Sequence, residues 1–302
     1  MLGQAARAMP RAPRKEVRAR LRAGLLLAGV VLAAFGYLQS TRNAGAVKCA
    51  DSQLAFFGSQ MRNVSQIVKE AFPGAMKGQA VMSKVLRAIR PYGVRQRNTI
   101  YGQSICSDEI NGDKGHFPAL MGKFYGKVFP LGGIGGAPYV GKTGFMAFSH
   151  HVPDDGNVVV VFGPHIGITM DGEPGKFLRE GQAAISTACG AVIAAYGQCK
   201  SGSMRSDPQD AQQSWLRAKL KQHTSAVTSS DNPMVELVMK AYEAVEEEVL
   251  AIVNTDFGPG NLVLVGGIQI NMPYPMNGYF LPLHFSIRGT GRKARNLMDA
   301  FD

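Results

Sequence analysis

The chain has 302 residues, of which 45% are hydrophobic and 18% are charged. This length and balance are typical of a globular protein with one large domain or two small ones, and they exclude a disordered or fibrous chain. The formal net charge is +11, but residues 1–48 hold nine basic residues against one acidic residue, or +8 of that total. The rest of the chain carries only +3, so a surface for binding nucleic acid is not expected there.

Residues 1–48 are predicted to be a leader. An arginine-rich stretch precedes an uncharged apolar run at 23–38, AGLLLAGVVLAAFGYL. The run is short for a bilayer span and a little long for the apolar region of a signal peptide. We predict a cleaved plastid targeting sequence, because Ala-Ala-Phe at 33–35 resembles the junction used by secondary plastids. A membrane anchor retained through residues 23–38 and an ordinary soluble helix are the alternatives.

Residues 49–302 are predicted to form a single domain of alternating helices and strands. The strand pattern is clearest in NVVVVF at 157–162, a β-branched run of the kind buried on both faces of a parallel sheet. The alternation predicts an α/β fold with a mainly parallel central sheet flanked by helices and preceded by N-terminal helices. In chain order we expect helices over 53–90 broken at Pro73, a strand at 99–106, a strand at 157–162, helices at 179–197, 209–222 and 233–253, and a strand at 261–270.

Three residues that can bind a metal lie at or just beyond strand ends. Cys106 closes the first strand, His165 follows the second, and Cys189 falls in the helix after it. In an open α/β sheet, ligands gather at the carboxyl ends of the strands. Two thiolates and one imidazole leave a fourth position vacant, which is typical of a catalytic zinc site, and thiolates favour zinc over magnesium or calcium. Taken singly, a cysteine in an apolar helix is usually a small buried hydrophobic residue, and a histidine after a strand is more often a hydrogen-bonded loop residue.

Four segments of the chain resemble the limiting-CO2-inducible protein B/C family, the theta-class carbonic anhydrases. The resemblance covers roughly residues 53–288 and implies a homodimer with a fold similar to that of beta-class carbonic anhydrases. It implies zinc bound by Cys106, His165 and Cys189, with Cys199 as an alternative to Cys189. The segments are CSDEIN (106–111), GKTGFMAFSHHVPDDG (141–156), FGPHIGI (162–168) and STACGA (186–191).

The resemblance implies the reversible hydration of CO2 to bicarbonate, in the acquisition of inorganic carbon. Zinc makes hydroxide available near neutral pH, and Asp108 is placed either to orient that hydroxide or to take the fourth position on the metal. In the beta class an arginine two residues after this aspartate holds it off the metal, whereas this chain has Ile110 there. His151, or its neighbour His150, is a candidate proton shuttle because imidazole titrates near neutral pH.

The sequence also contains features of other functions. A catalytically silent family member, acting as a structural or regulatory partner with related chains, is the main alternative, and Ile110 is the feature that favours it. Residues 136–143 satisfy the phosphate-loop pattern GxxxxGK[ST], but residues 144–148 read as extended where that loop needs a helix. We therefore expect a glycine-rich loop near the zinc site. A hydrolase based on Ser107 or Ser149 lacks a GxSxG motif.

Overall fold

The computed structural model describes residues 44–302 except 113–114, 203–204 and 254–256. The predicted leader, with its apolar run at 23–38, lies almost wholly outside these residues. Within the described part of the chain, no helix is both long and apolar enough to cross a membrane. The chain divides into two compact units after Ser59, within helix α2 (Ala44–Ala71), and the second unit, Gln60–Asp302, contains the sheet. The predicted boundary between residues 48 and 49 stays a prediction.

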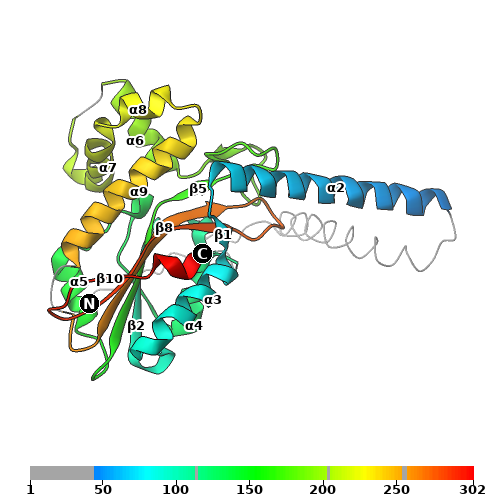
Figure 1. Ribbon diagram of the computed structural model, residues 1–302. Coiled ribbons are helices and arrows are strands. Elements are labelled where there is room, and N and C mark those ends of the chain that lie inside the picture. Colours follow the sequence, from blue (N-terminus) through cyan, green and yellow to red (C-terminus); the bar gives the residue numbers. More distant parts are fainter. Residues whose placement is uncertain (1–43, 113–114, 203–204, 254–256) are drawn as a thin grey trace, which may run out of the picture. The chain divides into compact units, whose positions relative to one another are not determined.

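An eight-stranded sheet forms the centre of the second unit (Figure 1). Its strands are β1 (Met76–Lys77), β2 (Thr99–Ile105), β3 (Val128–Pro130), β4 (Asn157–Gly163), β5 (His165–Gly167), β8 (Asn261–Asn271), β9 (Tyr279–Gly289) and β10 (Arg295–Asn296). The order along the sheet is β1-β9-β8-β4-β2-β3, with β5 paired to β8 and β10 to β9. Strands β3, β2, β4, β5 and β8 pair in parallel, whereas β9 pairs antiparallel with β8, β1 and β10. The predicted mainly parallel sheet is confirmed.

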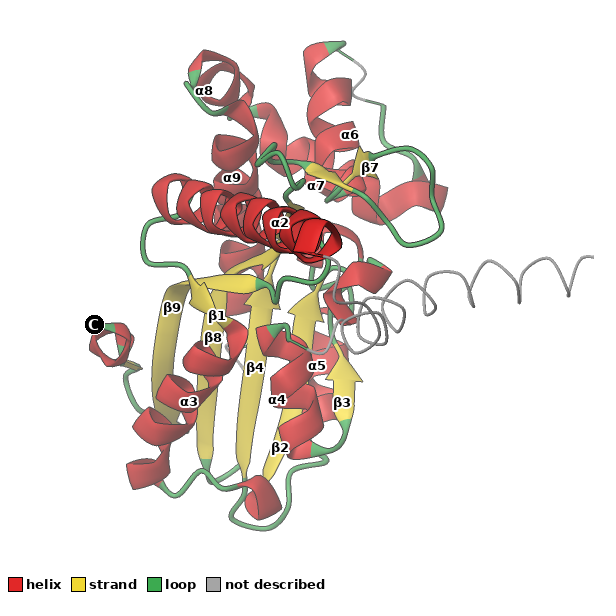
Figure 2. Ribbon diagram, turned by 90° about the vertical axis from the view of Figure 1, so that its right-hand side faces the viewer, coloured by secondary structure: helices red, strands yellow, loops and turns green. Residues whose placement is uncertain are grey.

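Helices cover both faces of this sheet, which explains why every residue of β4 is buried (Figure 2). Val159 and Val161 point into the core beneath α3 (Gly78–Ile89) and α4 (Phe117–Tyr125). Val158 and Val160 point to the opposite core, with α5 (Gly141–Ser149) and α9 (Pro233–Ile252). A strand buried on both faces has no polar side to present, so its sequence reads as an unbroken apolar run.

A third core cluster lies beyond the carboxyl end of β2. It is formed by α6 (Gly190–Lys200), α7 (Ala211–Lys221), α8 (Thr224–Ser229) and the first half of α9. Cys106 and Cys189 belong to this cluster, together with Val192, Leu216 and Leu237. The two thiols therefore lie at the junction between the sheet and this group of helices.

The helix predicted over 179–197 is wrong in its first half. Residues 176–187 instead form a small antiparallel pair of strands, β6 (Lys176–Phe177) and β7 (Ser186–Thr187). The loop between them turns at Gly181, whose φ of +79° is a backbone conformation that favours glycine. Cys189 consequently does not lie within a helix but is the extended residue immediately before α6.

The structure corrects one other expectation and adds one strand that had not been predicted. Residues 144–148, expected to be extended, lie within helix α5. Strand β9 was not predicted, because every second residue in its second half is polar: His284, Ser286 and Arg288. Phe285 and Ile287 alternate with them and enter the core beneath α3 and α4.

Candidate metal centre

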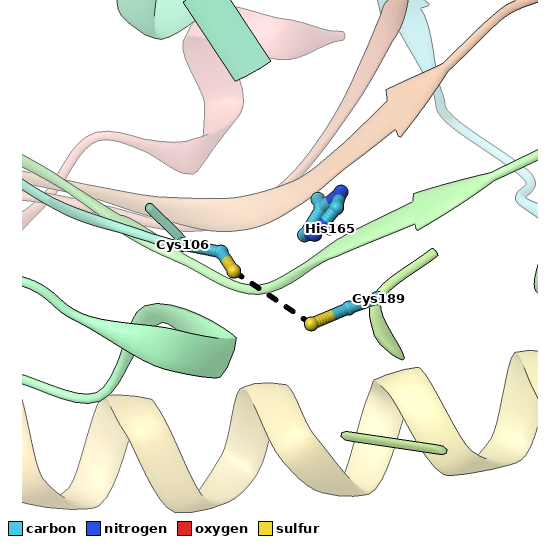
Figure 3. Close-up of side chains that lie close together, drawn as sticks. All are labelled: Cys106, His165 and Cys189. Atoms are coloured by element: carbon cyan, nitrogen blue, oxygen red, sulfur yellow. Dashed lines mark hydrogen bonds between the residues drawn. The ribbon is translucent and has the colours of Figure 1, made fainter. Parts of the chain in front are cut away.

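Cys106, His165 and Cys189 converge at the carboxyl ends of β2 and β4 (Figure 3). All three side chains are buried, and their ligand atoms lie within 4.8 Å of one another. The two sulfur atoms are 3.7 Å apart. Residues separated by 83 positions in the chain are thus brought together where an open α/β sheet gathers its ligands.

Close backbone contacts place these side chains. Gly163 ends β4 with φ +141°, and a side chain there would collide with the carbonyl oxygen of Gly267 on β8. Glycine therefore lets the chain leave β4 and join β8 as β5, which begins at His165. On the other side of the cluster, the backbone N–H of Gly135 donates to Cys106 Sγ at 3.2 Å. The glycine-rich loop expected near the site does lie against it.

The donor set fits a tetrahedral zinc ion. With Zn–S bonds of about 2.3 Å and tetrahedral angles, two thiolates on one zinc are about 3.8 Å apart, against 3.7 Å between Cys106 and Cys189. A disulfide would need about 2.05 Å, and both cysteines are free. The Nε2 atom of His165 is buried and has no hydrogen-bond partner among the described residues. A buried polar atom without a partner is costly, and a metal between it and the two sulfurs would satisfy it.

The thiol and imidazole groups perturb one another. The hydrogen bond from the neighbouring Cys189 lowers the pKa of Cys106 to about 4. The same shared proton raises the pKa of Cys189. Burial lowers the pKa of His165, but the nearby Cys106 thiolate outweighs it and leaves that pKa above its usual value. The lowered pKa of Cys106 favours its thiolate, the form that binds a metal.

Arg179 supplies the guanidinium that Ile110 does not. Its Nη2 atom is 2.7 Å from Asp108 Oδ2, and its Nε atom is 2.7 Å from Glu109 Oε1. Asp108 Oδ2 in turn lies 3.6 Å from His165 Nε2. Burial raises the pKa of Asp108, but hydrogen bonding and the charges of His165 and Arg179 outweigh it and hold that pKa below its usual value.

Sequence reasoning missed Arg179 because it comes from the loop between β6 and β7, 71 residues after Asp108. The sequence had predicted a helix over 179–197, where the structure has this loop. No spacing rule connects the two residues, and the only signal in the sequence was that an isolated aspartate beside a metal ligand needs a cation.

Several predicted residues lie outside this cluster. His151 is exposed after α5, and its ring lies 6.2 Å from that of Phe129, so a shuttling role for it stays a prediction. Cys199 lies near the end of α6, where its thiol donates to the carbonyl oxygen of Arg217 at 3.3 Å. The structure therefore brings Cys189 rather than Cys199 to Cys106.

The two serines considered for a hydrolase also lie outside the cluster. Ser107 is exposed, and the Ser149 hydroxyl donates to the carbonyl oxygen of Met146.

The phosphate-loop pattern at 136–143 has a helix after it but no strand directly before it. Strand β3 ends at Pro130, and α5 begins at Gly141. A phosphate loop uses free backbone N–H groups to hold phosphate oxygens. Here the N–H groups of four residues in the loop donate to carbonyl oxygens of the chain itself. These residues are Gly136, Ala137, Tyr139 and Gly141.

The fold and the three converging ligands define an α/β protein with a candidate metal centre of the Cys-His-Cys kind. A sequence model of the family described as "Limiting CO2-inducible proteins B/C beta carbonic anhydrases" matches residues 75–289. The chain belongs to this family, which supports a role with CO2 or inorganic carbon. The family match confirms the resemblance on which the site residues were chosen.

Several solved structures are similar to this chain to different degrees. PtLCIB4, a homolog of the limiting CO2-inducible protein LCIB, is 32% identical with a TM-score of 0.71, covering 76% of this chain and 98% of its own. LCIB itself is 21% identical with a TM-score of 0.60, covering 76% and 96%. A tetrameric beta-carbonic anhydrase from Sordaria macrospora is more distant, at 14% identity and a TM-score of 0.35, covering 78% and 92%. A search of curated protein sequences finds no match.

Proposed function

We propose that this protein is a zinc-dependent carbonic anhydrase that interconverts CO2 and bicarbonate. The observation that carries the proposal is the cluster of Cys106, His165 and Cys189, whose buried ligand atoms lie within 4.8 Å of one another. These three residues would hold the ion. A zinc ion in such a site acts as a Lewis acid that activates water as a nucleophile near neutral pH.

The other residues of the site would orient the reaction. Asp108, 12% exposed at its side chain, would accept a hydrogen bond from the attacking nucleophile and fix its direction. Arg179 would keep Asp108 away from the metal, since its guanidinium holds the Asp108 carboxylate at 2.7 Å. The apolar side chains of Val192, Leu216 and Leu237 beside the cysteines would exclude bulk water.

A catalytically silent partner protein is the second candidate. The feature that favoured it was Ile110, where beta-class enzymes have an arginine. In this chain Arg179 makes the corresponding contact with Asp108. That contact supports the enzyme over the silent partner, because the carboxylate is restrained in either arrangement.

The finer points of the proposal rest on the resemblance and on the leader. We assign the protein to the theta class and propose that it works as a homodimer in a CO2-concentrating system. The arginine-rich, almost acid-free residues 1–22 and the apolar run at 23–38 support import into a plastid. Size-exclusion chromatography with light scattering, and imaging of a fluorescent fusion to residues 1–48, test these two points.

The proposed activity is tested on the full chain by stopped-flow CO2 hydration, with the metal content of the same sample determined. We expect about one zinc per chain and activity that a chelator removes and added zinc restores. Bound zinc without CO2 hydration would favour the silent partner. A folded chain that binds no zinc would refute the proposed site.

A further inference from the structure

Two buried asparagines link the histidine and cysteine ligands from behind the site. Asn271 closes β8 and is fully buried, and Asn111 is 7% exposed. Asn271 Oδ1 is 2.7 Å from His165 Nδ1, and Asn271 Nδ2 donates to Asn111 Oδ1 at 3.1 Å. Asn111 Nδ2 then donates to the backbone carbonyl oxygen of Cys106, also at 3.1 Å. The two amides form an unbroken hydrogen-bonded chain from one metal ligand to another.

The orientation of both amides is determined by backbone carbonyl groups. Asn271 Nδ2 donates to the carbonyl oxygen of Ile110 at 3.2 Å, and Asn111 Nδ2 donates to that of Cys106. A carbonyl oxygen only accepts hydrogen bonds, so the NH2 group of each amide must face it. It follows that Asn271 presents its oxygen to His165.

An oxygen acceptor at Nδ1 requires that Nδ1 carry a proton. A neutral imidazole has one N–H, so its lone pair then lies on Nε2. Among the described residues, Nε2 is a buried atom without a hydrogen-bond partner, and His165 has a ligand nitrogen within 4.8 Å of both sulfurs. We propose that Asn271, held in place by Asn111, is a positioning residue that selects the metal-binding tautomer of His165. This inference rests on the zinc binding of the proposed function, not on its reaction with CO2.

The choice of an amide also bears on the charge of the site. A histidine that binds a metal often donates its other N–H to a carboxylate, which would add a negative charge beside the two thiolates of Cys106 and Cys189. An amide orients the ring equally well and adds no charge. Zinc with two thiolates and a neutral imidazole is electrically neutral, which suits a site buried as deeply as this one.

Zinc affinity, measured by competition with a chelator, tests the inference. Asn271→Leu removes the acceptor at similar volume, and we expect zinc to bind about 10–100-fold more weakly. Asn111→Leu should weaken binding less, and it should add little when Asn271 is already replaced, because the two residues act in one chain. Gln269→Leu is the matched control. Gln269 is equally buried on the same strand, but its amide donates to the carbonyl oxygens of Ile270 and Tyr279.

The tautomer can be read directly, without any variant, from nitrogen NMR of the zinc-loaded full chain. We expect zinc on Nε2 of His165 and a slowly exchanging proton on Nδ1. A proton on Nε2, or a Gln269→Leu variant that loses as much affinity as Asn271→Leu, would overturn the inference. A chain with the expected tautomer that hydrates no CO2 would contradict the proposed enzyme while supporting this role for Asn271.

Discussion

Two histidines of this chain are each held by a polar partner, yet only one of them is arranged to bind a metal. His165 is buried and bonds to Asn271 through Nδ1, and within the part of the chain that the structure describes its Nε2 has no hydrogen-bond partner. His284 is 21% exposed and uses both nitrogens, Nδ1 with Glu246 at 2.9 Å and Nε2 with Ser286 at 2.7 Å. The candidate metal ligand differs from His284 in having a buried ring nitrogen that no other described side chain or backbone group satisfies.

Together with Ser286 and Glu246, His284 forms a row of side chains that resembles a catalytic triad. Ser286 lies inside β9, however, and its backbone is paired with Leu264 on one side and Asn296 on the other. A serine nucleophile needs N–H donors for the oxyanion beside it. The backbone of β9 around Ser286 is instead paired with β8 and β10. The row is therefore a structural network between β9 and α9.

Replacing each histidine in turn gives the largest expected difference. His165→Ala removes one of three ligands, so we expect the bound zinc to be lost and CO2 hydration to fall to the uncatalysed rate. His284→Ala should retain about one zinc per chain and most of the activity. Zinc content and stopped-flow hydration of both variants measure this. Equal loss of zinc in the two variants would show that the His165 site is not the metal site.

Arg179 gives the next largest expected effect. In Arg179→Ala, Asp108 loses its cation and is free to approach the metal position, because its carboxylate already lies 3.6 Å from His165 Nε2. We expect activity to fall about 10–100-fold with zinc content unchanged. Arg179→Lys should recover only part, since an ammonium cannot bridge Asp108 and Glu109 as a guanidinium does.

Lys176→Ala is the matched control for Arg179. Lys176 lies on the adjoining strand β6 and forms an exposed ion pair with Glu173 at 2.7 Å. Exposed pairs of this kind contribute about 0–1 kcal/mol, so this variant should retain full activity. If Arg179→Ala were as active as the wild type, Asp108 would need no cation and the proposed restraint would be wrong.

His165 and Arg179 differ in how well their roles could be predicted from the sequence. Strands β4 and β8 were predictable because each contains a buried run of apolar residues. Cys106 and His165 follow the ends of β2 and β4, two strands that the sequence also indicated. Arg179 was not predictable, because an irregular loop brings it to Asp108. Loops of this kind are positioned by tertiary contacts, and no local periodicity marks them.

The asparagines behind His165 show the same limit in another form. From the sequence alone, Asn271 indicates only where strand β8 ends. Its function depends on the carbonyl of Ile110 and on Asn111, 160 residues earlier in the chain. Hydrogen-bond direction is a property of the assembled structure, and the sequence carries no period or motif for it.

A smaller effect is expected at the second histidine, on stability rather than activity. The hydrogen bond from His284 holds the pKa of Glu246 below its usual value of 4.5, and the Tyr242 hydroxyl adds to the effect. A depressed carboxyl pKa stabilises the folded state above 4.5, and this contribution is lost as the pH falls through the folded-state pKa. Since the pair is partly exposed, it should be worth no more than about 1 kcal/mol.

Urea unfolding of Glu246→Gln, followed from neutral to acidic pH, measures this contribution. The wild type should be the more stable at neutral pH, and the two curves should converge in acid. Glu247→Gln, an exposed residue on the same helix that pairs with Lys219, is the control and should follow the wild type throughout. A difference that grows as the pH falls would contradict the assigned direction of the Glu246 pKa.

The smallest expected effect is at Lys142, in the phosphate-loop pattern. Its side chain is exposed at the start of α5, and the loop before it uses its N–H groups internally. Lys142→Ala should therefore change stability by no more than about 0.5 kcal/mol and leave CO2 hydration unchanged, and ATP should show no saturable binding to the wild type. Saturable ATP binding that Lys142→Ala abolishes would mean that the loop rearranges to free its amides, and the chain would then have a second ligand site.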